Sequence, residues 1–160
     1  MASVICVISL LQIPLSTGVP VTLQVFAVAL AGYILGWARG SVAVLIYIAV
    51  GIVGVPVFSG YMGGFSAFFG PTGGFIVGFF LIALLSGLGR DQKAVLAILF
   101  GFAGLVLCHG LGVLHYRIIT NCSIGTALLT VSLPYIIKDM ALIAGAYFLS
   151  LPLKKRILKK

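Results

Sequence analysis

The run AVLAILFGFAGLVLCHGLGVL occupies residues 94–114 and contains no Asp, Glu, Lys or Arg. A helix needs about 20 consecutive apolar residues to cross the hydrocarbon core of a bilayer. The run therefore predicts a transmembrane helix, and it places the chain among integral membrane proteins.

The composition of the whole chain agrees with this class. Of its 160 residues, 62% are hydrophobic and 8% are charged, and the mean hydropathy is +1.30. Soluble domains have about 45–50% apolar and about 25% charged residues. We therefore expect a single all-α membrane domain over residues 1–160, with no room for a soluble catalytic or nucleotide-binding domain. No catalytic triad or metal-ligand cluster stands out, so we expect neither an enzyme nor a bound metal or cofactor.

Proline, glycine and polar turns divide the chain into hydrophobic segments. We expect six transmembrane helices, over residues 1–13, 20–36, 41–55, 72–88, 94–114 and 127–152, with Pro134 interrupting the last. An even number of crossings places both termini on one side of the membrane. The short connectors 37–40 and 89–93 share that side, whereas the longer ones lie opposite.

The charges are distributed unequally between the two sides. The net charge is +8, and half of the ten basic residues lie in the tail, as Lys154, Lys155, Arg156, Lys159 and Lys160. Arg39, Arg90 and Lys93 fall on the same side, and only Arg117 falls on the other. The positive-inside rule then predicts that both termini lie in the cytoplasm. Such a tail is expected to meet anionic membrane lipid and not nucleic acid.

The opposite connectors are rich in glycine and aromatic residues. Gly70, Pro71, Thr72, Gly73 and Gly74 lack the Gly-Lys-Ser/Thr ending of a phosphate-binding loop, which excludes nucleotide binding here. The glycines suit a tight turn, and Thr72 suits the cap of the next helix. Irregular backbone near a membrane is tolerated where it lines a cavity, so we expect a ligand cavity beneath the first and third connectors.

Small residues recur at helical spacing in two segments. Gly32 and Gly36 form one pair, and Gly104, Cys108 and Gly112 form a longer series. Such stripes allow helices to approach closely, and packing within the chain is the favoured interpretation over a dimer face.

Two adjacent charges, Lys138 and Asp139, lie inside the last hydrophobic segment. A charge at the centre of a bilayer costs about 2.5–3.5 kcal/mol on insertion scales and usually marks a ligand or ion path. Adjacent helical residues diverge by about 100°, so the two are expected to point apart and to hold two ligand groups, or one ligand group together with Arg117. The alternative is that they neutralise each other or a group of an outer connector. His109 and His115 are six residues apart, and we interpret them as polar packing or surface residues.

Several motifs together resemble the BioY family of biotin transporters. They are residues 39–47 (RGSVAVLIY), 51–58 (GIVGVPVF), 63–64 and 70–75 (GPTGGF), with 13–15 and 19–24 near the start and Leu133, Pro134, Tyr135 and Asp139 near the end. The resemblance covers nearly the whole chain.

The resemblance implies a six-helix substrate-capture (S) component of an energy-coupling-factor (ECF) transporter. Such proteins bind biotin from outside and work with a membrane T component and two ABC-type ATPases. The resemblance also implies a place in the bacterial cytoplasmic (inner) membrane. Biotin suits the candidate residues, since Asp139 can accept ureido N–H bonds and Lys138 or Arg117 can meet the carboxylate or the ureido oxygen. Thr22 and Gln24 would add neutral hydrogen bonds. The expected apolar walls are Tyr61, Phe65, Phe68 and Tyr116.

The chain departs from the family at two places. The last-helix motif of the family usually reads Gly-Asp-x-x-Lys, whereas Lys138 and Leu142 occupy the glycine and lysine positions here. These two positions lie one turn apart on a helix, so our hypothesis is that Lys138 supplies the displaced cation. In the first segment, Ala2 and Cys6 keep only a trace of the Ala-x-x-x-Ala face that meets the T component.

Two alternatives stay open at this point. One is an S component for another vitamin, and the other is an accessory membrane protein or small channel. The Gly-Pro-Thr-Gly-Gly block and Asp139 favour biotin, and polar residues in register along several spans, as a channel requires, are not seen.

Overall fold

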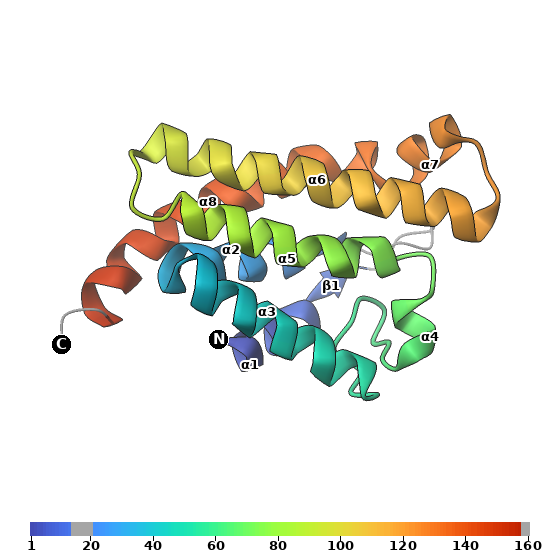
Figure 1. The fold of residues 1–160 in the computed structure, drawn as a ribbon, viewed down its shortest axis with the longest axis horizontal. Helices are drawn as coiled ribbons and strands as arrows, with labels where there is room; N and C mark the ends of the chain where they lie inside the picture. Colours follow the sequence, from blue (N-terminus) through green and yellow to red (C-terminus); the bar gives the residue numbers. More distant parts are fainter. Residues whose placement is uncertain (14–20, 158–160) are drawn as a thin grey trace.

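The computed structural model describes residues 1–13 and 21–157 of the chain. Eight helices and one short two-stranded ribbon account for most of the described residues (Figure 1). They are α1 (Ala2–Ser9), β1 (Gln12–Ile13), β2 (Val21–Thr22), α2 (Gln24–Leu35), α3 (Trp37–Ile52), α4 (Phe65–Phe68), α5 (Gly73–Leu88), α6 (Ala94–Thr120), α7 (Ile124–Val131) and α8 (Leu133–Ile157). The antiparallel ribbon pairs Gln12 with Thr22 and Ile13 with Val21.

Helix α2 lies at the centre of the bundle. It contacts α1, α3, α5 and α8, and almost all of its residues are buried. An apolar helix without a polar face is expected in such a position, because every side is covered by a neighbour. Its one buried polar ring, Tyr33, donates a hydrogen bond from its hydroxyl to the carbonyl of Ala97, at 3.0 Å.

Glycines allow three of the helices to approach closely. A Cβ atom at Gly78 of α5 would lie 2.6 Å from Sγ of Cys108 in α6, and one at Gly104 would lie 2.9 Å from Cα of Ile82. A Cβ atom at Gly32 of α2 would collide with the backbone carbonyl of Ala83 in α5. The prediction that the small residues serve packing within the chain is confirmed for Gly32, Gly104 and Cys108.

Two predicted connectors are helical in the structure. Trp37–Gly40 was expected to be a turn, but α3 begins at Trp37, because Gly36 alone reverses the chain at a φ of 82°. Residues 115–120 were also expected to lie in a connector, yet α6 continues to Thr120 and ends where Asn121 adopts a φ of 51°. Polar side chains at a helix end do not stop a helix unless the backbone also changes conformation.

The last predicted segment is divided. Helix α7 ends at Val131, Ser132 leaves the helical conformation at φ −121° and ψ −63°, and α8 begins at Leu133. Pro134 lies in the first turn of α8, where a missing backbone N–H costs nothing. The first helix is shorter than the predicted segment 1–13, since α1 ends at Ser9. The connector between the first two predicted segments, over residues 14–19, lies outside the described residues.

The two ends of the bundle differ. At one end, Lys154 donates a hydrogen bond to the carbonyl of Arg90 at 2.6 Å, and this joins α8 to the short α5–α6 connector. At the other end, α4, α7 and the ribbon gather (Figure 1), and His115 lies 3.0 Å from the carbonyl oxygen of Gly70. The basic connectors therefore share an end with the tail, and Arg117 lies towards the other.

Two of the described helices are long and apolar enough to cross a membrane by themselves, over Ala94–Thr120 and Leu133–Arg156. Three shorter apolar helices, α2, α3 and α5, have 12 to 16 residues. At about 1.5 Å per residue, a helix of that length is shorter than the roughly 30 Å hydrocarbon core. By length and composition, the described residues thus support two of the six predicted spans directly.

Candidate functional site

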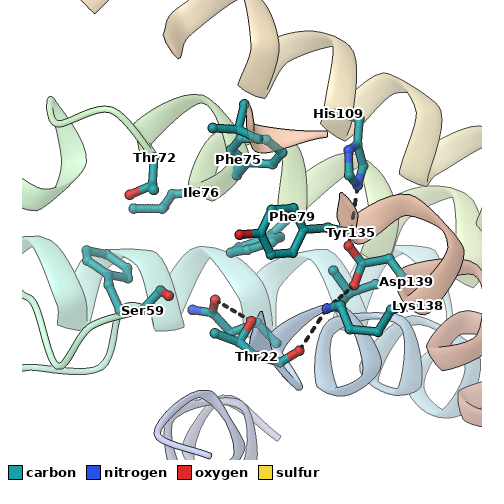
Figure 2. Close-up of a pocket in the computed structure, with 14 residues that line it drawn as sticks. Thr22, Ser59, Thr72, Phe75, Ile76, Phe79, His109, Tyr135, Lys138 and Asp139 are labelled. Atoms are coloured by element: carbon teal, nitrogen blue, oxygen red, sulfur yellow. Dashed lines mark hydrogen bonds and ion pairs between the residues drawn. The ribbon is translucent and has the colours of Figure 1, made fainter. Parts of the chain in front are cut away.

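A cavity opens between the helices at the end that holds α4 and α7. Its empty space is about 580 Å³, counted out to the open mouth. The lining residues come from β2, α2, α5, α6, α7, α8 and the loop after α3 (Figure 2). They are Thr22, Gln24, Val25, Phe58, Ser59, Thr72, Phe75, Ile76, Phe79, His109, Val131, Tyr135, Lys138 and Asp139. This is the end at which the sequence predicted a cavity.

Lys138 and Asp139 both line this cavity, but they do not point apart as predicted. Their Nζ and Oδ1 atoms form an ion pair at 2.5 Å. The prediction is wrong because it considered only the directions of the Cβ atoms, whereas a lysine side chain is long enough to fold back along the helix surface. The same Nζ also donates to the carbonyl of Thr22 at 3.1 Å, which joins α8 to the ribbon.

Asp139 has a second partner that the sequence analysis did not assign to the site. Nε2 of His109 lies 3.4 Å from Oδ2 of Asp139 (Figure 2). Nδ1 of His109 lies 2.9 Å from the hydroxyl oxygen of Ser132. Both His109 and Asp139 are buried, with exposed fractions of 5% and 4%. One signal could have identified His109: it is a polar side chain in the middle of a long apolar run, where such residues tend to be functional.

Thr22 and Gln24 form a supporting network on the opposite wall. The hydroxyl of Thr22 donates to Oε1 of Gln24 at 3.1 Å, and Nε2 of Gln24 donates to the hydroxyl of Tyr47 at 2.7 Å. That hydroxyl donates in turn to the carbonyl of Val57 at 3.1 Å. Both functional atoms of Gln24 are therefore engaged within the protein, and Gln24 holds Thr22 in position.

The loop over residues 70–74 is a rigid rim of the cavity. A Cβ atom at Gly73 would collide with the carbonyl of Phe68, and one at Gly74 would lie 2.5 Å from Cβ of His115. Thr72 occupies the cap position of α5, as predicted, but its side chain makes no capping hydrogen bond. It lines the cavity instead. Glycines at these positions allow the rim to lie against α6.

Several residues expected at the site lie away from the cavity. Tyr61 is 63% exposed on the loop before α4, and Phe65 is 67% exposed. Tyr116 packs against a separate apolar cluster of Val113, Ala127 and Val131, and Arg117 is exposed near the end of α6. The aromatic walls are instead Phe58, Phe75, Phe79 and Tyr135.

The arrangement suits a small molecule with both apolar and polar parts. The carboxylate of Asp139 can accept N–H donors, and the ammonium of Lys138 can hold an anionic or carbonyl oxygen. The aromatic rings enclose these groups on the apolar side, as in most small-molecule sites. The geometry thus defines a binding protein whose site lies within a helical membrane bundle.

The sequence assigns this binding protein to a family. The model of the BioY family matches residues 1–159, and the chain belongs to that family.

Individual relatives agree over most of their length. The chain is 37% identical to the biotin transporter BioY of Thermotoga maritima, covering 91% of this chain and 86% of the relative. It is 36% identical to a probable biotin transporter BioY of Pyrococcus horikoshii, covering 87% and 83%. Its fold is similar to that of the S-component for biotin from an ECF-type ABC transporter, with a TM-score of 0.87 and 24% identity over 96% of this chain and 86% of that one.

Proposed function

We propose that this protein is the biotin-binding S component of an ECF-type transporter, which captures biotin within the membrane for uptake. The observation that supports this most strongly is the ion pair of Lys138 with the buried Asp139, found in the cavity of a chain that belongs to the BioY family. Biotin has an apolar bicyclic ring, a ureido group with two N–H donors and a carboxylate on an aliphatic arm. Each part has a partner of matching chemistry in the cavity.

We assign Asp139 as the acceptor of a ureido N–H and Lys138 as the cation for the ligand. Lys138 lines the cavity, whereas Leu142, at the usual lysine position of the family, does not. This supports the hypothesis that the cation has moved by one turn of α8. Thr22 and Thr72 supply hydroxyl groups, and Phe58, Phe75 and Phe79 enclose the ring system.

The same proposal includes the arrangement in the membrane. Six crossings, with α7 and α8 together forming the last, would place both termini in the cytoplasm. The gathering of Arg90 and Lys154 at one end of the bundle supports this orientation by the positive-inside rule. The cavity would then open to the outside, where biotin is captured.

Active uptake requires a source of energy, which partner proteins would supply. We propose a membrane T component and two ABC-type ATPases, because the relative with the same fold is described as part of an ECF-type ABC transporter. The test is uptake of radiolabelled biotin by cells that lack their own biotin transporter and express this chain with such a module. Uptake that excess unlabelled biotin suppresses, and that other vitamins do not, is expected. Absence of uptake by a chain correctly inserted in the membrane would contradict the proposal.

A further inference from the structure

His109 is the one histidine among the residues that line the described cavity. The other ionisable residues of the lining are Tyr135, Lys138 and Asp139. Lys138 and Asp139 neutralise each other in their ion pair. Histidine ordinarily gains or loses its proton between about pH 5 and pH 8. The net charge of the empty cavity therefore depends on His109.

The contacts of His109 suit both protonation states. Nε2 lies 3.4 Å from Oδ2 of Asp139, and Nδ1 lies 2.9 Å from the hydroxyl oxygen of Ser132. In the neutral tautomer that carries its proton on Nε2, this N–H faces the carboxylate and Nδ1 can accept from the hydroxyl. In the protonated ring, both nitrogens donate, and the hydroxyl of Ser132 rotates to accept. Neither state requires the ring to move, so a proton can be added without disturbing the helices.

Apart from Lys138 and Asp139, the described lining of the cavity holds no charged side chain near His109. From α5, Phe75 meets the imidazole edge to face with ring centroids 5.5 Å apart. On α6 itself, the thiol of Cys108 contacts the carbonyl of Phe75 at 3.6 Å. From α8 come Asp139, Lys138 and the phenol of Tyr135. Thr22 and Gln24, on the other wall, are neutral. Asp139 is thus the only anion near the ring in this part of the chain.

We propose that His109 takes up a proton when the carboxylate of biotin enters the cavity, so that it selects the anionic form of the ligand. This inference rests on the proposed function. Lys138 can balance one negative charge, but the bound state contains two, that of Asp139 and that of the ligand. A buried carboxylate without a compensating positive charge is strongly disfavoured. Protonated His109 supplies the second positive charge at Asp139 and frees Lys138 for the ligand.

The linkage has a definite sign. If binding adds a proton, the affinity for biotin rises as the pH falls, by up to about tenfold per pH unit. The carboxylate of biotin stays ionised in this range, since such groups titrate near pH 4. Biotinamide has no carboxylate and should bind without proton uptake.

Isothermal titration calorimetry on the purified full chain in detergent tests the inference. Binding is measured at one pH near 7.5 in two buffers that differ in ionisation enthalpy. The apparent enthalpy of biotin binding should differ between the two buffers in proportion to the number of protons taken up. The apparent enthalpy of biotinamide binding should be the same in both. This comparison needs no variant. His109→Asn should lose the buffer dependence, and its Kd for biotin should change by less than about twofold between about pH 6 and pH 8. His115→Asn, the control for the second histidine, should keep the pH dependence.

Biotin binding with the same enthalpy in both buffers would overturn the role of His109 while leaving the proposed function intact. Buffer dependence that persists in His109→Asn would overturn it too, because another group would then carry the proton. Absence of any biotin binding would contradict the proposed function itself. The same titration therefore distinguishes a failure of the proposed function from a failure of the role of His109.

Discussion

Lys138 donates one hydrogen bond to Asp139, its neighbour in the sequence, and another to the carbonyl of Thr22, which precedes it by 116 residues. The single ammonium group therefore connects α8 to the ribbon in the wall of the cavity. Asp139 receives Lys138 on one oxygen and faces His109 with the other. A ligand that bonds to Asp139 or Lys138 must rearrange these contacts, so substitution of either residue should change ligand binding.

Asp139→Asn should weaken biotin binding by about 10- to 100-fold. A hydrogen bond to a charged group contributes about 1.5–3 kcal/mol, and each 1.4 kcal/mol corresponds to about a factor of ten in Kd. The substitution preserves the size of the side chain but removes its charge. The control is Asp91→Asn, since the Asp91 side chain is 81% exposed at the opposite end of the bundle. Equal affinities for the wild type and Asp139→Asn would place the ligand elsewhere.

Lys138→Met should weaken biotin binding by at least about tenfold, because the cavity loses its permanent cation while the buried Asp139 remains. The double variant Lys138→Met with Leu142→Lys returns a lysine to the usual position of the family, one turn away on the same face. It should recover part of the loss. Full affinity in Lys138→Met would contradict the idea that this residue replaces the family lysine.

Gly78→Ala should destabilise the protein by about 1–3 kcal/mol, because the new methyl group overpacks the contact between α5 and α6. The Cβ atom would lie 2.7 Å from Cα of Cys108, and backbone cannot yield as a flexible side chain can. Gly110→Ala is a matched control, since a Cβ there meets nothing within 4 Å. Thermal unfolding in detergent should show a lower Tm for Gly78→Ala alone. Equal losses in the two variants would contradict close glycine packing.

Arg117→Cys and Arg39→Cys should react from opposite sides of the membrane. Each is introduced into a chain whose Cys6, Cys108 and Cys122 have been replaced. A membrane-impermeant maleimide added to intact cells should label Arg117→Cys, and it should label Arg39→Cys only after permeabilisation, as the positive-inside rule predicts. Both variants should react in detergent, which controls for accessibility. The reverse pattern would invert the proposed orientation.

The fold could be predicted from the sequence where apolar runs are long and bounded by glycine or proline. The limits of α5 were predicted to within one residue, because Thr72 and Gly89 frame its apolar run. An interruption of the last segment was predicted at Pro134, and the break lies close to it, at Ser132 between α7 and α8. Pro134 itself is accommodated in the first turn of α8, so the proline indicated the place of the break only approximately. The start of α3 at Trp37 depends on the backbone of Gly36 alone.

At the site, the charged residues could be predicted from the sequence, because a charge in the membrane has a high free-energy cost. Residues whose role depends on partners distant in the sequence could not. Asp139 and Lys138 were identified because a charge in an apolar segment requires an explanation. His109 was interpreted as packing because its partners, Ser132 and Asp139, lie 23 and 30 residues further along the chain. Arg117 and Tyr116 were assigned to the site from their side of the membrane, yet a shared side does not imply a shared cavity.

Equilibrium binding of biotin to the purified chain tests the central claim most directly. We predict saturable binding at a single site, with a Kd below the micromolar range, and a large loss of affinity in Asp139→Asn that Asp91→Asn does not share. No binding at micromolar biotin, by a protein that still unfolds cooperatively on heating, would contradict the assignment of this cavity as a biotin site.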